Sequence, residues 1–354
     1  MRVRARGVIQ AVMALFLATA CGGGPSTVVT ISPTASSPAV LDDRFGFLVG
    51  NAVRSESDPQ PLFVLDIAND SGGVVSPDGR RLAYWADHEL RVIDVAPGAQ
   101  WRTLLAVTSP EGALYFAWSS DGTGIVIGVN GPQAGVPDAP PAYTALRVVD
   151  VAAGNPREVI RIPNANVVPL AWDREARLIA AYESFSGGAG TYDVIEEGGT
   201  LKRANAGPGI YILEASQDGQ QLLGRGDPNS VLRVWPRDSY ERGVEFRAPG
   251  DEHILVAAWR PGTTEIGVLF HDRLELWDAN GARRTVGLPP APPSSDRYAS
   301  LVFRADGRAV LVSRRLDANS DPYVLAVDLA SGRSAVVQMG GSEPLPGRSV
   351  RIAP

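Results

Sequence analysis

The residues with the most evident chemistry are three oxygen-bearing side chains that alternate along one short stretch. Asp317, Asn319 and Asp321 have the spacing of ligands in a calcium loop, and Asp328 stands at the twelfth position. Pro322, however, occupies the place where an EF-hand loop needs glycine, and no helical pattern flanks the segment. The alternative is a hairpin loop whose Asp and Asn side chains bond to their own backbone. We prefer that alternative. Calcium is the one cofactor that the sequence suggests, with Asp317, Asn319 and Asp321 as a weak candidate site.

Other catalytic or metal-binding patterns do not occur in the sequence. The chain has three histidines, His88, His253 and His271, at spacings that fit no metal site. No nucleophile elbow, phosphate-binding loop or dinucleotide glycine fingerprint is present. We therefore predict no catalytic residues and no bound cofactor, and expect a protein that is not an enzyme.

The only cysteine, Cys21, lies at the end of an N-terminal leader. Three arginines precede an apolar stretch from Val8 to Ala20, as in a secretory signal peptide. The run Leu17-Ala18-Thr19-Ala20-Cys21 resembles the lipobox of bacterial lipoproteins, although Ala18 stands where that motif usually has Leu. The resemblance implies cleavage of residues 1–20 and a lipid on Cys21. The alternative is a cysteine that stands there by chance.

The segment after Cys21 is rich in Gly, Ser, Thr and Pro, which is typical of a flexible tether. We assign residues 21–44 to the lipidated cysteine and this tether, and residues 45–354 to the folded domain. The expected location is the bacterial cell membrane or cell envelope, on the extracytoplasmic side, with the lipid as membrane contact.

The net charge argues against nucleic acid as a partner. The chain has 33 basic and 39 acidic residues, for a net charge of −6, and they are interspersed. Because no basic stripe forms, no nucleic acid partner is expected. The chain is expected to be a monomer.

A repeat of roughly 44 residues organises the folded part. Each unit begins with an apolar run that ends in a polar turn, such as Ser76-Pro77-Asp78-Gly79. The turn after Trp172, Asp173-Arg174-Glu175-Ala176, departs from this pattern because it lacks the glycine. The six runs close at Val75, Trp118, Trp172, Ala215, Trp259 and Phe303.

Within a repeat the sequence predicts four short strands. In one repeat they cover Gly73–Val75, Leu82–Trp85, Leu90–Val95 and Trp101–Val107, separated by Pro, Gly and Asp turns. This is the pattern of a β-propeller blade, so the predicted fold class is all-β, a propeller of four-stranded antiparallel blades. The large rings that end the apolar runs are expected to fill the space between neighbouring blades, with an aromatic ligand cage as the alternative.

The number of blades depends on the two ends of the domain. Phe45–Gly50 and Pro61–Asp66 read as two further strands before the first apolar run, and Ser349–Ile352 reads as a lone strand at the end. Joining them completes a seventh blade and removes the exposed sheet edges. Seven blades are the prediction, and six, with the N-terminal strands as decoration, the alternative.

The repeats resemble the WD40-like blades of the TolB C-terminal propeller, which also occur in prolyl oligopeptidases. Ser76-Pro77-Asp78-Gly79 matches the motif of that family, and the stretch from Asp317 to Val324 is similar to its loop and third strand. The resemblance covers residues 45–354 and implies the fold. It also suggests contact with an envelope protein, because the TolB propeller serves in an envelope complex.

The functional expectation is a binding or scaffold module that presents loops to a protein, peptide or glycan. The alternative is a propeller hydrolase, lactonase or lyase with an axial site of carboxylates and a metal. Such a site would need acidic residues or histidines on the innermost strands, and the predicted innermost strands are mostly apolar.

Overall fold

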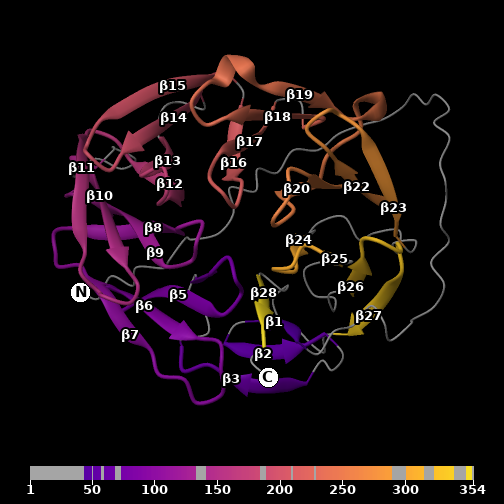
Figure 1. Ribbon diagram of the computed structural model, residues 1–354, viewed down its shortest axis with the longest axis horizontal. Helices are drawn as coiled ribbons and strands as arrows, with labels where there is room; N and C mark the ends of the chain where they lie inside the picture. Colours follow the sequence, from indigo (N-terminus) through magenta and orange to yellow (C-terminus); the bar gives the residue numbers. More distant parts are fainter. Residues whose placement is uncertain are drawn as a thin grey trace, which may run out of the picture.

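Seven four-stranded antiparallel sheets surround a common axis in the computed structural model (Figure 1). The structure describes residues 44–49, 51–56, 60–67, 73–132, 141–183, 189–208, 210–226, 229–288, 300–314, 323–338 and 348–352. Within these residues, helix is limited to two short 3₁₀ turns, Tyr240–Arg242 and Pro249–Asp251. The prediction of an all-β propeller with seven blades is confirmed, and the six-bladed alternative is wrong.

In blades 2 to 7 each sheet is a meander whose first strand lies nearest the axis. Blade 2 consists of β4 (Gly73–Val75), β5 (Arg81–Ala86), β6 (Glu89–Asp94) and β7 (Arg102–Ala106). Blade 3 consists of β8 (Gly112–Trp118), β9 (Gly124–Asn130), β10 (Tyr143–Asp150) and β11 (Arg157–Pro163). Blade 4 consists of β12 (Val167–Asp173), β13 (Leu178–Glu183), β14 (Ala189–Glu196) and β15 (Leu201–Pro208). Blade 5 consists of β16 (Tyr211–Ala215), β17 (Gln221–Arg225), β18 (Val231–Pro236) and β19 (Val244–Arg247). Blade 6 consists of β20 (Val256–Trp259), β21 (Ile266–Leu269), β22 (Arg273–Trp277) and β23 (Arg283–Gly287). Blade 7 consists of β24 (Ser300–Phe303), β25 (Ala309–Arg314), β26 (Tyr323–Asp328) and β27 (Ser334–Gln338).

Blade 1 combines the two ends of the chain. Its order is β28 (Arg348–Arg351), β1 (Phe45–Val49), β2 (Ala52–Ser55) and β3 (Pro61–Val64), with β28 antiparallel to β1. The predicted joining of the ends is therefore confirmed. The expectation of two N-terminal strands was wrong, because Ala52–Ser55 forms a third that pairs with β1 across the short hairpin at Asn51.

A side-chain hydrogen-bond pattern fixes the turn after the first strand of a blade. In blade 2 the hydroxyl of Ser76 donates to Asp78, while the N–H of Arg81 donates back to that hydroxyl at 3.0 Å. Gly79 takes a left-handed φ of 76°, which glycine adopts without strain. The turns at Ser119 and Ser216 repeat these bonds. The Ser-x-Asp-Gly pattern therefore satisfies the turn's polar groups and closes it tightly.

The rings that end the first strands pack between blades, as predicted. Trp172 of blade 4 joins a buried cluster with Val126 and Leu146 of blade 3. A Cβ atom at Gly124 would lie 2.4 Å from the Trp172 ring, so glycine leaves room for the indole. Phe303 has the same relation to Gly267 of blade 6.

A buried ion pair crosses the junction between the last and first blades. The Nε of Arg304, after β24, lies 2.8 Å from Oε1 of Glu56, after β2. The two side chains are only 6% and 0% exposed. Removing one partner of such a pair leaves the other charge buried without compensation, which is costly.

The substitution Arg304→Met is expected to lower the free energy of unfolding by about 3–5 kcal/mol, because Glu56 would remain buried without its cation. Urea denaturation at neutral pH measures the change. The control is Arg242→Met, which removes an exposed ion pair with Asp238 and is expected to cost less than about 1 kcal/mol. The double variant Glu56→Gln/Arg304→Met should recover part of the loss. Equal effects of the two single variants would contradict a role for the buried pair in closing the ring.

Candidate functional site

Several residues predicted to bind a lipid or a metal lie outside the described part of the chain. These are Cys21, Asp317, Asn319 and Asp321. Two proline-rich segments, residues 131–144 and 288–297, are described only at their flanks, such as Tyr143 and Leu288.

The three histidines belong to two separate blades. His88 lies in the β5–β6 hairpin with a φ of 66°. His253 precedes β20 and His271 lies between β21 and β22, two segments joined by a 2.9 Å bond from the N–H of Leu255 to the carbonyl of Leu269. Burial, with the charges of Arg225 and His271, lowers the pKa of His253. Among the described residues no group of three His, Cys, Asp or Glu side chains could hold a metal ion.

One carboxylate near the axis was not expected from the sequence. Glu214 lies in β16, among apolar neighbours on an innermost strand, and accepts the backbone N–H of Trp259 from β20. Burial raises the pKa of Glu214 to about 7, against the opposing effect of this hydrogen bond. The sequence of β16 does not predict a buried carboxylate at Glu214, because a single Glu in an otherwise apolar strand indicates a side chain that faces solvent.

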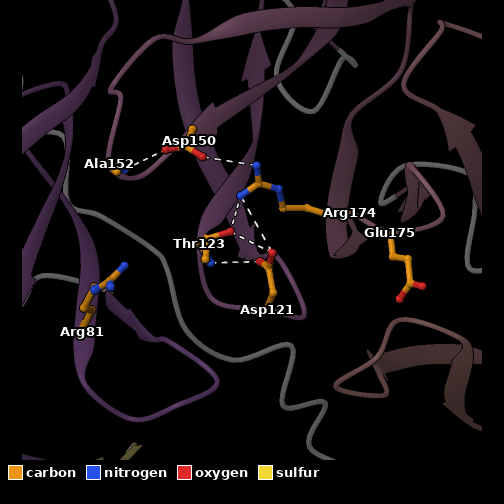
Figure 2. A pocket seen from close by; sticks show the side chains of 7 residues that line it. All are labelled: Arg81, Asp121, Thr123, Asp150, Ala152, Arg174 and Glu175. Atoms are coloured by element: carbon orange, nitrogen blue, oxygen red, sulfur yellow. Dashed lines mark hydrogen bonds and ion pairs between the residues drawn. The ribbon is translucent and has the colours of Figure 1, made fainter.

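Two open hollows that share lining residues lie on the face formed by the first and third turns of blades 2 to 4, and Figure 2 shows the first of them. The first hollow has a volume of about 620 Å³ and the second about 310 Å³. They share Asp150, at the end of β10, and Arg174, in the β12–β13 turn. The first is lined by Arg81, Asp121, Thr123, Asp150, Ala152, Arg174 and Glu175; the second adds Val148, Asn155, Arg157, Trp172, Arg177 and Glu197.

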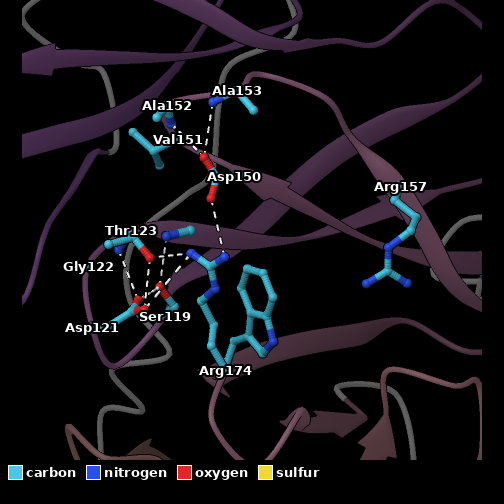
Figure 3. Close-up of polar contacts among 12 residues, drawn as sticks. Ser119, Asp121, Gly122, Thr123, Asp150, Val151, Ala152, Ala153, Arg157 and Arg174 are labelled. Atoms are coloured by element: carbon cyan, nitrogen blue, oxygen red, sulfur yellow. Dashed lines mark hydrogen bonds and ion pairs between the residues drawn. The ribbon is translucent and has the colours of Figure 1, made fainter.

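Arg174 forms the partition between the hollows. Its Nη2 lies 3.2 Å from Oδ2 of Asp150, its Nη1 donates to the hydroxyl of Thr123, and Asp121 lies 3.9 Å away (Figures 2 and 3). The guanidinium also stacks over the ring of Trp172, at 5.1 Å from its centroid. These contacts from two blades hold the side chain in one position.

The carboxylates beside Arg174 are held in the ionised form. The N–H of Ala153 lowers the pKa of Asp150 most strongly, with help from the N–H of Ala152 and from Arg174 and against partial burial. Burial opposes ionisation of Asp121, but hydrogen bonds from Ser119 and Thr123 outweigh it and leave its pKa lowered. The first hollow therefore carries fixed negative charge at neutral pH.

The second hollow is built around Glu197, in the β14–β15 turn. Oε1 of Glu197 accepts the indole N–H of Trp172 at 2.8 Å, and Oε2 lies 2.9 Å from Nη2 of Arg157. The Nε of Arg177 is 3.6 Å from the same oxygen. The Glu197 side chain is 10% exposed, whereas those of Arg157 and Arg177 are 51% and 69% exposed. Two accessible guanidinium groups therefore converge on one carboxylate.

The turn that carries Arg174, Glu175 and Arg177 is the one that lacks glycine. Arg177 adopts a left-handed φ of 57°, a conformation that costs roughly 1–2 kcal/mol for a residue with a Cβ. Beneath the turn, Asp173 accepts the N–H of Ala176 at 3.0 Å and bonds to Arg237 of blade 5 at 3.0 Å. The turn is thus strained at Arg177 and firmly anchored at Asp173.

The charges that line the two hollows balance. Four arginines face four carboxylates, so the net charge is zero: Arg81, Arg157, Arg174 and Arg177 against Asp121, Asp150, Glu175 and Glu197. No nucleophile paired with a general base occurs among these residues. The arrangement can form ion pairs and hydrogen bonds with a ligand. Sequence reasoning missed it, although the atypical turn at Asp173–Ala176 was visible.

Comparisons with known proteins establish the fold. No protein-family model matches the sequence, and no curated protein matches it. Among solved structures, an oligogalacturonate lyase in complex with manganese aligns with a TM-score of 0.55 and 16% identity over 74% of this chain and 77% of the other. The dihydro-heme d1 dehydrogenase NirN aligns with a TM-score of 0.51 and 14% identity over 91% and 78%. TolB from Acinetobacter baumannii aligns with a TM-score of 0.45 and 15% identity over 79% and 64%. The sheet order of the chain itself makes it a seven-bladed propeller.

Replacing Glu214 by Gln is expected to stabilise the fold more at pH 8 than at pH 5. The raised pKa, about 7, means that the folded protein keeps a proton on Glu214 that the unfolded chain loses near pH 4.5. Ionised Glu214 therefore costs stability that grows as the pH rises from about 4.5 to 7, up to about 3 kcal/mol. The amide oxygen of Gln can still accept the N–H of Trp259.

Urea denaturation of both proteins at pH 5 and pH 8 measures this difference, with the exposed Glu241→Gln as control. A difference between wild type and Glu214→Gln that is the same at both pH values would contradict the burial of this carboxylate.

Proposed function

We propose that this protein is a lipid-anchored, extracytoplasmic binding module whose two hollows on blades 2 to 4 bind a segment of a partner protein or peptide. The observation that carries the proposal is the convergence of four arginines and four carboxylates in two adjoining hollows on one face of a rigid ring. Charged groups in such an arrangement select a partner by electrostatic complementarity.

The strained backbone conformation of Arg177 also favours this face of the ring as the binding face. A non-glycine residue with a φ of 57° costs stability, and the turns at Ser76, Ser119 and Ser216 have glycine in the left-handed conformation. Strain of this kind is common at ligand-binding positions, where a particular side chain is needed. Here the side chain retained is an exposed guanidinium at the edge of the second hollow.

The anchor is proposed from the sequence of the leader. The arginines, the apolar stretch and the run ending at Cys21 support lipidation and export. A lipid on Cys21 and the tether of residues 21–44 would hold the ring at a membrane surface. In the described part of the chain no helix is long and apolar enough to cross a bilayer.

The enzyme alternative has fold similarity as its only support, since a lyase and a dehydrogenase are among the structures similar to this chain. At 14–16% identity this similarity does not extend to activity.

The substitution Cys21→Ala is expected to move the protein from the membrane fraction to the soluble fraction, because the lipid would have no attachment point. Fractionation of bacterial cells that express each form, followed by immunoblotting, measures the distribution. Ser26→Ala, in the tether, is the control and should stay with the membrane. A Cys21→Ala protein that remains in the membrane fraction would contradict the lipid anchor.

Peptides selected from a random displayed library on the wild-type protein are expected to bind to the hollows. Ala152→Trp fills the first hollow from the β10–β11 turn without changing charge, and should weaken these peptides about tenfold or more. Ala279→Trp is the matched control, because Ala279 is exposed in the corresponding turn of blade 6. Titration calorimetry compares the affinities. Equal binding to all three proteins, or a library that yields no binder, would contradict the proposed function.

A further inference from the structure

The second hollow has more positive charge than its own carboxylate neutralises. Arg174 is paired with Asp150 on the side of the first hollow, at 3.2 Å. Arg157 and Arg177 share a single carboxylate, Glu197. Glu196 and Lys202, which lie close to Glu197 in the sequence, form a weak ion pair with each other at 3.9 Å. They therefore add no net charge to the hollow. The second hollow therefore keeps one uncompensated positive charge.

Most of the donor groups in this hollow remain available. A guanidinium has five N–H donors in a fixed planar fork. Arg157 uses one for Oε2 of Glu197 and a second for the carbonyl of Glu197, at 2.9 and 3.4 Å. Arg177 makes an ion pair at 3.6 Å, beyond hydrogen-bond distance. Its donors can therefore form strong bonds with an added anion.

Glu197 is held so that the remaining donors of Arg157 and Arg177 stay available. The indole N–H of the buried Trp172 fixes Oε1 at 2.8 Å, which keeps the carboxylate on the floor of the hollow. Glu197 thereby positions Arg157 and Arg177 from below and leaves their outer edges exposed. A second carboxylate can meet two guanidinium groups at these edges, in the paired geometry that arginine favours.

We propose that the second hollow is a subsite for an acidic residue of the partner, whose carboxylate binds between Arg157 and Arg177. This inference rests on the proposed function and specifies what the site recognises. The φ of 57° at Arg177 is then the cost of placing a guanidinium at this point of the turn, one residue after the position at which the turns at Ser76 and Ser119 have glycine. A carboxylate, a phosphate and a sugar acid share the relevant chemistry, and we assign an acidic side chain because a peptide is the proposed occupant of the adjoining first hollow.

The test uses the full chain labelled with ¹⁵N-tryptophan. The Trp172 indole N–H reports on Glu197, because the two are hydrogen bonded; Trp172→Phe identifies its NMR signal. The probes are acetyl-Gly-Ser-Glu-Ser-Gly-amide, the same peptide with Gln or Lys in place of Glu, galacturonate and inorganic phosphate.

The Glu peptide is expected to shift the Trp172 signal saturably, with a dissociation constant of roughly a millimolar, and the Gln and Lys peptides to leave it unchanged. Arg157→Gln and Arg177→Gly should each weaken the Glu peptide about tenfold. Arg177→Gly relieves the strained φ, so it should fold at least as stably as the wild type. Arg284→Gln is the matched control, because Arg284 makes the same kind of bond between blades 6 and 7 without lining either of the two hollows.

Equal binding of the Glu and Gln peptides, or no saturable shift with the Glu peptide, would overturn the subsite. Tighter binding of galacturonate or phosphate than of the Glu peptide would overturn the assignment to an acidic residue. Library peptides that depend on the Ala152 surface but carry no acidic residue would leave the proposed function standing and the subsite refuted.

Discussion

The pairing of β28 with β1 is the constraint on which the rest of the molecule depends. Each blade buries its faces against two neighbours, so an open ring would expose the faces and the edges at both ends. The C-terminal strand supplies the innermost strand of the first blade, and the buried Arg304–Glu56 pair joins that blade to the last one. Aromatic rings such as Trp172 and Phe303 fill the space between the other neighbouring blades.

The candidate site grows out of the same inter-blade contacts. An arginine on the outermost strand repeatedly donates to a backbone carbonyl that follows the third strand of the next blade, as Arg102 does to Val151 and Arg284 to Leu329. At the junction of blades 3 and 4, Arg157 keeps this bond to the carbonyl of Glu197 and also pairs with the Glu197 carboxylate. A contact that elsewhere only joins blades thus becomes part of a charged hollow, once Glu197 and the strained Arg177 are added.

The sequence predicts the ring better than the site, for a physical reason. The Ser-x-Asp-Gly turns and the apolar runs are local patterns, so strands, blade spacing, the joining of the ends and the packing role of Trp172 could be predicted. The strand Ala52–Ser55 was missed because its polar residues mask the alternation. Arg157, Arg177 and Glu197 come from three separate turns or strands, and only the folded ring brings them together. Their one local sign was the absence of glycine after Asp173. Glu214 gave no sign, because its burial depends on the neighbouring blade.

Hydrogen exchange of the protein with and without a library-selected peptide tests the central claim most directly, since it reports on every blade at once. Binding in the two hollows predicts protection confined to the β4–β5, β8–β9, β10–β11, β12–β13 and β14–β15 turns, with the rest of the ring unchanged. Protection centred instead on the opposite face, for example at the Asp87-His88 hairpin, would contradict the assignment of blades 2 to 4 as the binding face.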